Sequence, residues 1–389
     1  MVATQLKGPA KLESLQIVRA LAAFMVVFHH SQATALMISK VDWPQMVWGA
    51  AGVDVFFVIS GFIMVYVSEN RRARPLRFMY DRVVRIMPNY WLATGVAVAL
   101  ALTATFWPYP IKPSYVLNSA FLIPELRPGT TGDYSPLVFP GWSLRFEFYF
   151  YAIFSLALLL HRSRIAVATL LLMLTQYLFF LVQKDAQIAK ELIKHNFIVI
   201  EFVFGMLIAD IHLRYGDKIS EFIRKFSLWI IAPASILLIA GAFGLLILED
   251  FRLFPQGTAH LRPFTWGIPS ALIVVIMLYM LPPLMEGRWA RRAFKPIVMM
   301  GDASYSVYLY HIFVIPYVSR MGFARPFDGM TSYFVHIGTI FVITAILSWI
   351  IFKVFEAPSG RLLKRLWPRG SAERSAGSQR HAPLSAENA

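Results

Sequence analysis

Runs of apolar residues recur along the whole chain at lengths close to the 20 residues that an α-helix needs to cross a bilayer. A barrel strand needs only about ten residues of alternating character, so these lengths favour helices over strands. The pattern therefore predicts an all-α integral membrane protein with about ten transmembrane helices. The ten predicted segments are residues 14–36, 47–67, 89–106, 142–160, 165–182, 197–213, 228–248, 264–284, 297–317 and 333–355.

Composition agrees with a membrane protein. Hydrophobic residues make up 57% of the chain and charged residues only 15%, whereas about a quarter of the residues of a soluble domain are charged. The net charge of +15 would suggest nucleic-acid binding in a soluble protein. Here the basic residues lie between apolar runs and not along one soluble face, so we expect no nucleic-acid partner. The chain has no cysteine, which excludes thiolate metal sites and an acyl-cysteine intermediate, and we expect no metal.

Lys and Arg residues are distributed unevenly among the loops between the apolar runs. Most of them fall on one side of the bilayer if the chain begins in the cytoplasm, as the positive-inside rule requires. With an even number of spans, both termini are then cytoplasmic. We expect a cytoplasmic N-terminal segment (1–11), one transmembrane domain (12–365) and a cytoplasmic tail (366–389) with too little apolar surface to fold.

The longest loop on the far side, residues 107–141, is rich in Pro, Tyr and Trp. Such a loop can form a lid or a substrate-binding surface, and it can equally be a partly ordered connector. The sequence leaves both interpretations open.

The first apolar run carries Arg19 and His30. Eleven residues return to within about 20° of the same helix face, with a rise of about 16 Å. The two side chains are therefore expected to line one cavity, with the arginine nearer the cytoplasm and the imidazole deeper. The alternative is a packing histidine with an arginine that reaches the interface.

Two further arginines, Arg82 and Arg85, are three residues apart, and so share one face at the cytoplasmic entry of the third span. Guanidinium groups suit phosphate or carboxylate recognition. The alternative is an ordinary excess of positive charge on the cytoplasmic side.

The fourth span places Glu147 in the outer part of the membrane, one turn after Ser143. A charged group inside a bilayer is costly unless it faces a partner or a wet cavity, so Glu147 is a functional candidate. The alternative is an ion pair with a neighbouring arginine. Asp54, in the outer part of the second span, is a further candidate.

The ninth span carries Ser304, Tyr308 and His311 at positions i, i+4 and i+7. A hydroxyl, a phenol and an imidazole therefore share one face of that helix. Such a stripe either binds a substrate or joins helices by hydrogen bonds.

These candidates divide into two groups, with arginines near the cytoplasmic face and His30, Glu147 and Asp54 farther out. This arrangement of the two groups suits a phosphate-bearing ligand that enters from the cytoplasm and a second substrate that contacts it deeper in the membrane. An imidazole is a natural base for a hydroxyl at that junction. A proton-coupled transporter would also need buried charged residues, so the residues alone leave both classes open.

Six motifs in order resemble acyltransferase family 3 of membrane proteins, and the chain is most similar to the exopolysaccharide O-acetylase members of that family. The resemblance extends from residue 12 to about residue 365. The motifs are LESLQIVRALAAFMVVFHH with Arg19 and His30, GVDVFFVISGF, RFMYDRVVRIMPNYW with Arg82 and Arg85, PGWSLRFEFYFY with Trp142, Ser143 and Glu147, DASYSVYLYHI, and FEAPSGRLLKR with Glu356 and Pro358.

The resemblance implies transfer of an acyl group, usually acetyl from acetyl-CoA, to a glycan hydroxyl at the bacterial inner membrane. Arg19 and His30 would be the essential catalytic pair, and Arg82 and Arg85 would bind the CoA donor. Glu147, the third catalytic candidate, would lie near the acceptor. The acceptor would be a glycan or a lipid-linked oligosaccharide, with polysaccharide assembly proteins as further partners. We take six other positions as substrate-binding candidates: Asp54, Trp142, Ser143, Ser304, Tyr308 and His311.

Some members of the family carry an extra span and a fused periplasmic hydrolase-like domain. Here a short tail follows the last predicted span, so we expect transfer to be completed within the membrane domain or with a partner. Two alternatives remain. One is succinyl-CoA as donor, and the other is a transporter or flippase for a lipid-linked sugar, which predicts inverted repeats that the sequence does not show.

Overall fold

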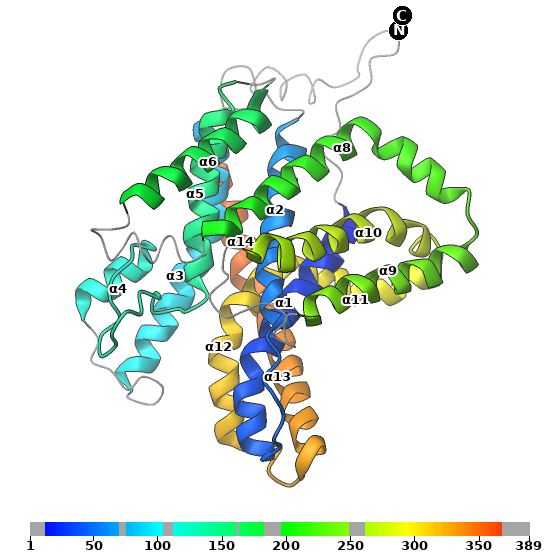
Figure 1. Cartoon of the computed structure of the whole chain (residues 1–389). Coiled ribbons are helices and arrows are strands. Elements are labelled where there is room, and N and C mark those ends of the chain that lie inside the picture. Colours follow the sequence, from blue (N-terminus) through cyan, green and yellow to red (C-terminus); the bar gives the residue numbers. More distant parts are fainter. Residues whose placement is uncertain are drawn as a thin grey trace, which may run out of the picture.

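The computed structural model describes residues 12–69, 75–103, 112–160, 163–182, 196–248 and 261–367. Throughout these ranges the regular secondary structure is helical and no strand occurs, which confirms the all-α prediction (Figure 1). The elements in chain order are α1 (Glu13–Ser39), η1 (Trp48–Ala51), α2 (Gly52–Ser68), α3 (Pro75–Leu102), α4 (Pro113–Ala120), α5 (Gly141–Ala157), α6 (Arg164–Val182), η3 (Asn196–Ile198), α8 (Val199–Arg224), α9 (Leu228–Leu248), η5 (Pro263–Gly267), α10 (Ile268–Leu284), α11 (Arg288–Asp302), α12 (Ser304–Met321), α13 (Gly329–Ile351), η6 (Phe352–Glu356) and α14 (Ala357–Leu366).

Every predicted apolar run falls on a helix over most of its described residues, and the end of the third run, residues 104–106, lies outside the described residues. In the described part of the chain, six helical stretches are long and apolar enough to cross a bilayer. They are Glu13–Ser39, Trp48–Ser68, Pro75–Leu102, Leu228–Ile247, Pro263–Leu284 and Gly329–Leu366.

Two boundaries differ from the prediction. The helix expected from residue 89 begins at Pro75, a residue type that suits the first helical turn, so Arg82 and Arg85 lie within α3 and not at its entry. The run expected at residues 297–317 is interrupted at Ala303, between α11 and α12. Around this break Gly301 packs so closely on α1 that an added Cβ would lie 1.9 Å from the Gln16 carbonyl oxygen.

Helix α1 is the central element. It contacts α2, α10, α11, α12 and α13, and in the lower part of Figure 1 it lies beside α12 and α13. Small side chains such as Ala22 and Ala23 are completely buried in these contacts. Because partners surround α1, its polar side chains Arg19 and His30 project into the protein interior and not into lipid.

Helices α2 and α8 cross at close range through two glycines. An added Cβ at Gly61 would lie 2.1 Å from the Phe202 carbonyl oxygen, and one at Gly205 would lie 1.9 Å from that of Val58. Small residues at such crossings let two backbones approach within a membrane, where dispersion contacts are a main source of helix association.

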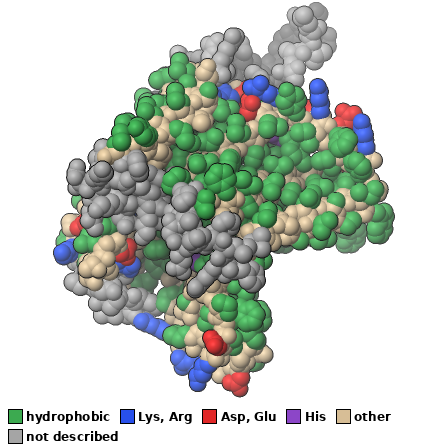
Figure 2. All heavy atoms as spheres, in the orientation of Figure 1, with side chains coloured by type: hydrophobic (Ala, Val, Ile, Leu, Met, Phe, Trp, Pro, Cys, Tyr) green, Lys and Arg blue, Asp and Glu red, His purple; other side chains and the backbone are tan. Residues whose placement is uncertain are grey.

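The face of the molecule over α8, α9 and α10 is largely apolar. Hydrophobic side chains cover most of the visible face over α8, α9 and α10, while charged groups gather at its edges (Figure 2). On α9, Trp229 is 91% exposed and Leu237 is 74% exposed. An apolar surface of this extent marks contact with lipid and not with water.

Candidate active site

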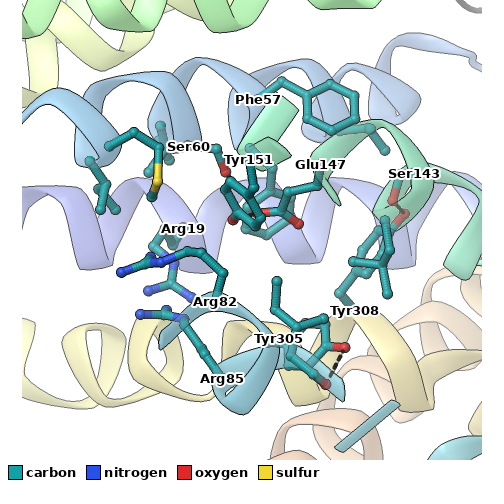
Figure 3. A pocket seen from close by; sticks show the side chains of 17 residues that line it. Arg19, Phe57, Ser60, Arg82, Arg85, Ser143, Glu147, Tyr151, Tyr305 and Tyr308 are labelled. Carbon is teal, nitrogen blue, oxygen red and sulfur yellow. Dashed lines mark hydrogen bonds between the residues drawn. The ribbon is translucent and has the colours of Figure 1, made fainter. Parts of the chain in front are cut away.

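A small cavity of about 80 Å³ lies between α1, α2, α3, α5 and α12. We call it the arginine cavity, because three arginines point into one side of it (Figure 3). Its polar lining residues are Arg19, Ser60, Arg82, Arg85, Ser143, Glu147, Tyr151, Tyr305 and Tyr308.

The three arginines enter the cavity from two helices. Arg19 of α1 is buried, and its NH1 group donates a hydrogen bond to Gln16 Oε1 at 3.3 Å. Arg82 of α3 lies over the rings of Phe78 and Tyr151. Arg85, one turn later on α3, is exposed and lies at the rim. The structure therefore brings together the arginines that the sequence predicts at one end of the molecule.

Glu147 lies opposite these arginines. Its carboxylate accepts hydrogen bonds from Ser60, at 3.0 Å, and from Tyr151. The sequence grouped Glu147 with His30, away from the arginines, and that grouping is wrong. The face of α5 that carries Glu147 turns toward α2 and α3. The position of Glu147 along its own helix does not reveal which neighbouring helices it faces.

A buried network adjoins the arginine cavity and is centred on Glu356, for which the closing sequence motif predicts no role or partner. Ser306 on α12 donates a hydrogen bond to Glu356 Oε2 at 2.6 Å. Asn89 on α3 donates to the same oxygen at 3.1 Å and accepts a hydrogen bond from Tyr310. Glu356 ends the π-helical turn η6, a distortion that often marks functional sites. The sequence feature that could have indicated Glu356 as a site residue is its position as an acidic residue at the end of an apolar run.

A larger cavity of about 570 Å³ lies between α1, α2, α5, the π-helical turn η5 and the loop at residues 121–140. We call it the histidine cavity. Its polar and aromatic lining residues are His29, His30, Asp133, Tyr134, Ser135, Phe139, Trp142, Arg145, Phe146, Arg262, Trp266 and Tyr308.

His30 lines this cavity and pairs with a second histidine behind it. His30 Nδ1 lies 2.9 Å from Nε2 of His311, and the two rings are nearly parallel, with centroids 5.1 Å apart and an interplanar angle of 12°. His311 is completely buried, and its Nδ1 lies 3.2 Å from the Val307 carbonyl oxygen.

Arg262 enters the histidine cavity from the start of η5. Its Nε and NH2 groups donate to the two carboxylate oxygens of Asp54 at 2.9 and 2.8 Å, and its guanidinium lies 4.4 Å from the Trp266 ring centroid. Asp54 is fully buried and is not one of the residues that line this cavity. We predicted that Asp54 binds substrate directly. In the structure it instead holds Arg262, which reasoning from the sequence left in a loop.

The loop at residues 121–140 supplies one wall of the histidine cavity. Arg145 of α5 fastens it, donating from Nε to the Leu122 carbonyl at 3.0 Å and from NH1 to the Tyr134 carbonyl at 2.8 Å. Within the loop, Asp133 accepts hydrogen bonds from Arg127 and from the Ser135 backbone N–H. Burial opposes ionisation of Asp133, but these donors outweigh it and hold the pKa of its carboxyl below the ordinary value. The loop is therefore part of the site.

Tyr308 lines both cavities. Its hydroxyl oxygen lies 2.7 Å from Ser143 Oγ, and both hydroxyls lie 3.1 Å from the Pro140 carbonyl oxygen. Arg19 and His30, expected to line one cavity, instead line two neighbouring cavities that share Tyr308 and Val53 as lining residues. Eleven residues along α1 place both side chains on the same face, but Val53 of α2 and Tyr308 of α12 lie where the two cavities adjoin.

The remaining candidates are dispersed. Trp142 lines the histidine cavity, whereas Ser143 lines the arginine cavity. Ser304 is completely buried, is not a lining residue of either cavity, and its hydroxyl has no hydrogen-bond partner among the described residues. Ser304, Tyr308 and His311 share one face of α12, but they lie in three different environments and do not form one substrate-binding surface.

Comparison with known protein families matches residues 12–353 to an acyltransferase domain, which is nearly the whole chain. The chain belongs to acyltransferase family 3. Its membership accounts for the order of the six motifs, and the arginines, Glu147 and His30 of those motifs line the two cavities.

Individual relatives agree with this membership of acyltransferase family 3. The exopolysaccharide production protein ExoZ of Rhizobium meliloti is 34% identical over 300 residues, which cover 76% of this chain and 87% of ExoZ. The O-acetyltransferase OatA of Staphylococcus aureus is 25% identical over 90% of this chain, which spans 57% of OatA. The putative membrane-bound transacylase BcsY of Komagataeibacter xylinus is 26% identical over 68% of this chain and 65% of BcsY. No solved structure matches the chain.

Proposed function

We propose that this membrane acyltransferase transfers an acetyl group from acetyl-CoA to a hydroxyl of an exopolysaccharide or another cell-surface glycan. The observation that carries the proposal is the pair of cavities that share Tyr308, one lined by three arginines and the other by an imidazole and several aromatic rings. The names of the relatives support it, since they include an exopolysaccharide production protein and an O-acetyltransferase.

We place the chain in the bacterial inner membrane with ten transmembrane helices and both termini in the cytoplasm. The Lys and Arg bias of the loops supports this orientation. The arginine cavity then faces the cytoplasm, where acetyl-CoA is available, and the histidine cavity faces the far side.

The donor enters the arginine cavity with its acyl end first. About 80 Å³ admits a small acyl group but not a nucleotide, so the phosphates of the donor lie outside, near the exposed guanidinium of Arg85. Guanidinium groups bind phosphate oxygens through charge-assisted hydrogen bonds. Arg82 and Arg19 lie deeper, where a guanidinium can stabilise negative charge that develops on the thioester oxygen.

The acceptor occupies the histidine cavity, which is large enough for a sugar ring. The rings of Trp142 and Trp266 offer flat apolar surfaces, and Arg145 and Arg262 supply polar groups beside them. A glycan or lipid-linked oligosaccharide fits this combination of flat apolar surfaces and hydrogen-bonding groups. Proteins of polysaccharide assembly are the expected partners that deliver it.

The chemistry is acyl transfer at the junction of the two cavities. His30 takes the proton from the acceptor hydroxyl, the hydroxyl oxygen forms an ester bond with the acyl carbon, and the carbon–sulfur bond of the thioester breaks. The proton then passes to the thiolate, so that CoA leaves as a thiol and no metal is required. General-base catalysis of this kind contributes about 10² to 10⁴ in rate.

The test compares exopolysaccharide from cells with the gene intact, deleted, or carrying His30→Ala, with O-acetyl groups measured by proton NMR. His212→Ala is the matched control, because His212 is also a helical histidine but contacts Tyr279, away from both cavities. We expect O-acetyl signals to disappear in the deletion and in His30→Ala, and to persist in the control.

Wild-type acetylation by correctly inserted His30→Ala protein would overturn the assignment of His30. Succinyl groups on the glycan, distinguished by mass spectrometry, would change the donor to succinyl-CoA. Persistent acetylation with reduced glycan export in the deletion strain would instead favour a transporter.

A further inference from the structure

The pairing of His30 with His311 determines which ring nitrogen of His30 is free to accept a proton. The two imidazoles come from α1 and α12, far apart in sequence. Their facing nitrogens, His30 Nδ1 and His311 Nε2, are 2.9 Å apart, a normal hydrogen-bond distance. One of these two nitrogens must therefore donate a proton to the other.

The surroundings of His311 decide which one donates. Its Nδ1 lies 3.2 Å from the Val307 carbonyl oxygen, and a carbonyl oxygen can only accept a hydrogen bond. His311 Nδ1 therefore carries a proton. The ring is completely buried, where a cationic imidazolium without a counter-charge is costly, so His311 is neutral and its Nε2 carries a lone pair.

The proton between the two rings consequently belongs to His30. His30 Nδ1–H donates to His311 Nε2, and the lone pair of a neutral His30 is then on Nε2. We infer that His311 is a positioning residue that holds His30 in the Nδ1–H tautomer, so that His30 Nε2 is the atom that accepts the proton of the acceptor hydroxyl. This inference rests on the proposed function, because it assumes that His30 is the base.

His311 acts through His30 and not on the substrate. It is completely buried and is not a lining residue of the histidine cavity, whereas His30 is half-buried and lines it. The substrate-binding role predicted for His311 is replaced by this one. In the Ser-His-Asp triad, a buried aspartate carboxylate orients the catalytic imidazole in the same way, by accepting a hydrogen bond from its Nδ1–H. Here a neutral imidazole, itself fixed by a backbone carbonyl, supplies the acceptor.

The pair also prepares His30 to carry a positive charge during the reaction. When Nε2 takes the proton, the ring becomes an imidazolium, and the existing bond from Nδ1–H to His311 becomes charge-assisted. Because that bond is made before the reaction, no group has to move to stabilise the charge.

The first experiment measures transfer kinetics in membranes that contain the full-length protein, with acetyl-CoA and the exopolysaccharide repeat unit as substrates. His311→Phe removes the acceptor nitrogen but keeps a planar ring, whereas His311→Gln keeps an acceptor oxygen near the Nε2 position. We expect His311→Phe to lower kcat by about 10² to 10³, within the range for loss of general-base catalysis, with little change in either KM. His311→Gln should recover kcat to within about tenfold of wild type.

The matched control is His336→Gln. His336 is another buried histidine, and it contacts Thr34 and Ser319, not His30. Its kcat and KM should equal those of wild type. A loss of kcat in His311→Phe but not in His336→Gln would show that replacing a buried histidine of the bundle is not by itself enough to lower kcat, and the recovery in His311→Gln separates positioning from folding.

The second experiment reads the tautomer directly by ¹⁵N NMR of histidine-labelled protein, with the His30 signals assigned as those absent from His30→Ala. We expect protonated Nδ1 and non-protonated Nε2 in wild type and in His311→Gln, and a mixture of tautomers in His311→Phe. If His311→Phe does not insert, the tautomers in wild type and His311→Gln remain decisive. A protonated Nε2 in wild type, or an unchanged kcat in inserted His311→Phe, would overturn the inference.

Failure of this inference differs from failure of the proposed function. An inactive His30→Ala with a fully active His311→Phe would remove only the role of His311. Full activity of His30→Ala would remove the proposed base itself.

Discussion

The hydroxyl groups of Tyr308 on α12 and Ser143 on α5 lie 2.7 Å apart at the boundary between the arginine cavity and the histidine cavity. Tyr308 lines both cavities, and so does Val53 of α2, so these two side chains lie where the cavities adjoin. The hydrogen bond joins two helices that come from different halves of the chain. A donor in one cavity and an acceptor in the other would therefore meet at Tyr308.

Tyr308→Phe tests this boundary. The ring stays, but Ser143 and the Pro140 carbonyl lose a buried hydrogen-bond partner, which typically costs about 1 to 3 kcal/mol. We expect a lower midpoint of thermal unfolding in detergent and a lower kcat. Tyr317→Phe, at a partly exposed tyrosine on the same helix, should leave both quantities unchanged. Equal behaviour of the two variants would mean that the Tyr308 hydroxyl has no role.

Replacing Arg85 with alanine should weaken donor binding. Loss of one hydrogen bond to a charged group costs about 1.5 to 3 kcal/mol, and 1.4 kcal/mol corresponds to a factor of ten in affinity. We therefore expect KM for acetyl-CoA to rise at least tenfold, while KM for the glycan stays the same. Arg77→Ala is the control, since Arg77 pairs with Asp81 and stacks on Trp367. An unchanged donor KM in Arg85→Ala would remove Arg85 from the donor site.

The ion pair between the buried Asp54 and the partly exposed Arg262 should behave as a unit. Removing one partner of a buried ion pair leaves an uncompensated charge and costs about 3 to 5 kcal/mol, whereas replacing both with apolar residues is often nearly neutral. We expect Asp54→Leu and Arg262→Met each to lower the unfolding midpoint, and the double variant to regain much of the loss. The single variants should also raise KM for the glycan, because Arg262 lines the histidine cavity. Additive losses in the double variant would contradict this coupling.

The crossing of α2 and α8 should tolerate no side chain at Gly205. An alanine Cβ there would lie 1.9 Å from the Val58 carbonyl oxygen, so the two backbones must separate. Overpacking of this kind typically costs about 1 to 3 kcal/mol, and we expect a clear fall in the unfolding midpoint of Gly205→Ala. Gly244→Ala is the control, because nothing lies within 4 Å of its added Cβ. A normal midpoint for Gly205→Ala would show that the crossing can relax.

The sequence predicts the helices well, because each depends on a local property, the length of an apolar run. It also predicts that Arg19, Arg82 and Arg85 gather, since charge in a membrane protein concentrates at particular depths. The interruption at Ala303 is a tertiary effect. It occurs where Gly301 packs against the α1 backbone, which no periodicity within the run at residues 297–317 reveals.

The division of the site into two cavities could not be predicted. It depends on which residue of one helix projects between residues of another. Tyr308 and Val53 lie where the cavity of Arg19 adjoins that of His30, and Glu147 turns toward Ser60 and Tyr151. Pairs such as Asp54 with Arg262 join parts of the chain about 200 residues apart, and helical periodicity carries no information on such pairings.

The Tyr308 boundary also bears on the energy supply of the cell. A bacterial inner membrane stores an electrochemical gradient, and a continuous water-filled path through any of its proteins would discharge that gradient. In the orientation that we propose, the two cavities would open toward opposite compartments, and Tyr308 and Val53, which line both, would keep their water apart. The side chains that an acyl group must pass would therefore also block the passage of protons. The enzyme could then bind both substrates without letting protons cross the membrane.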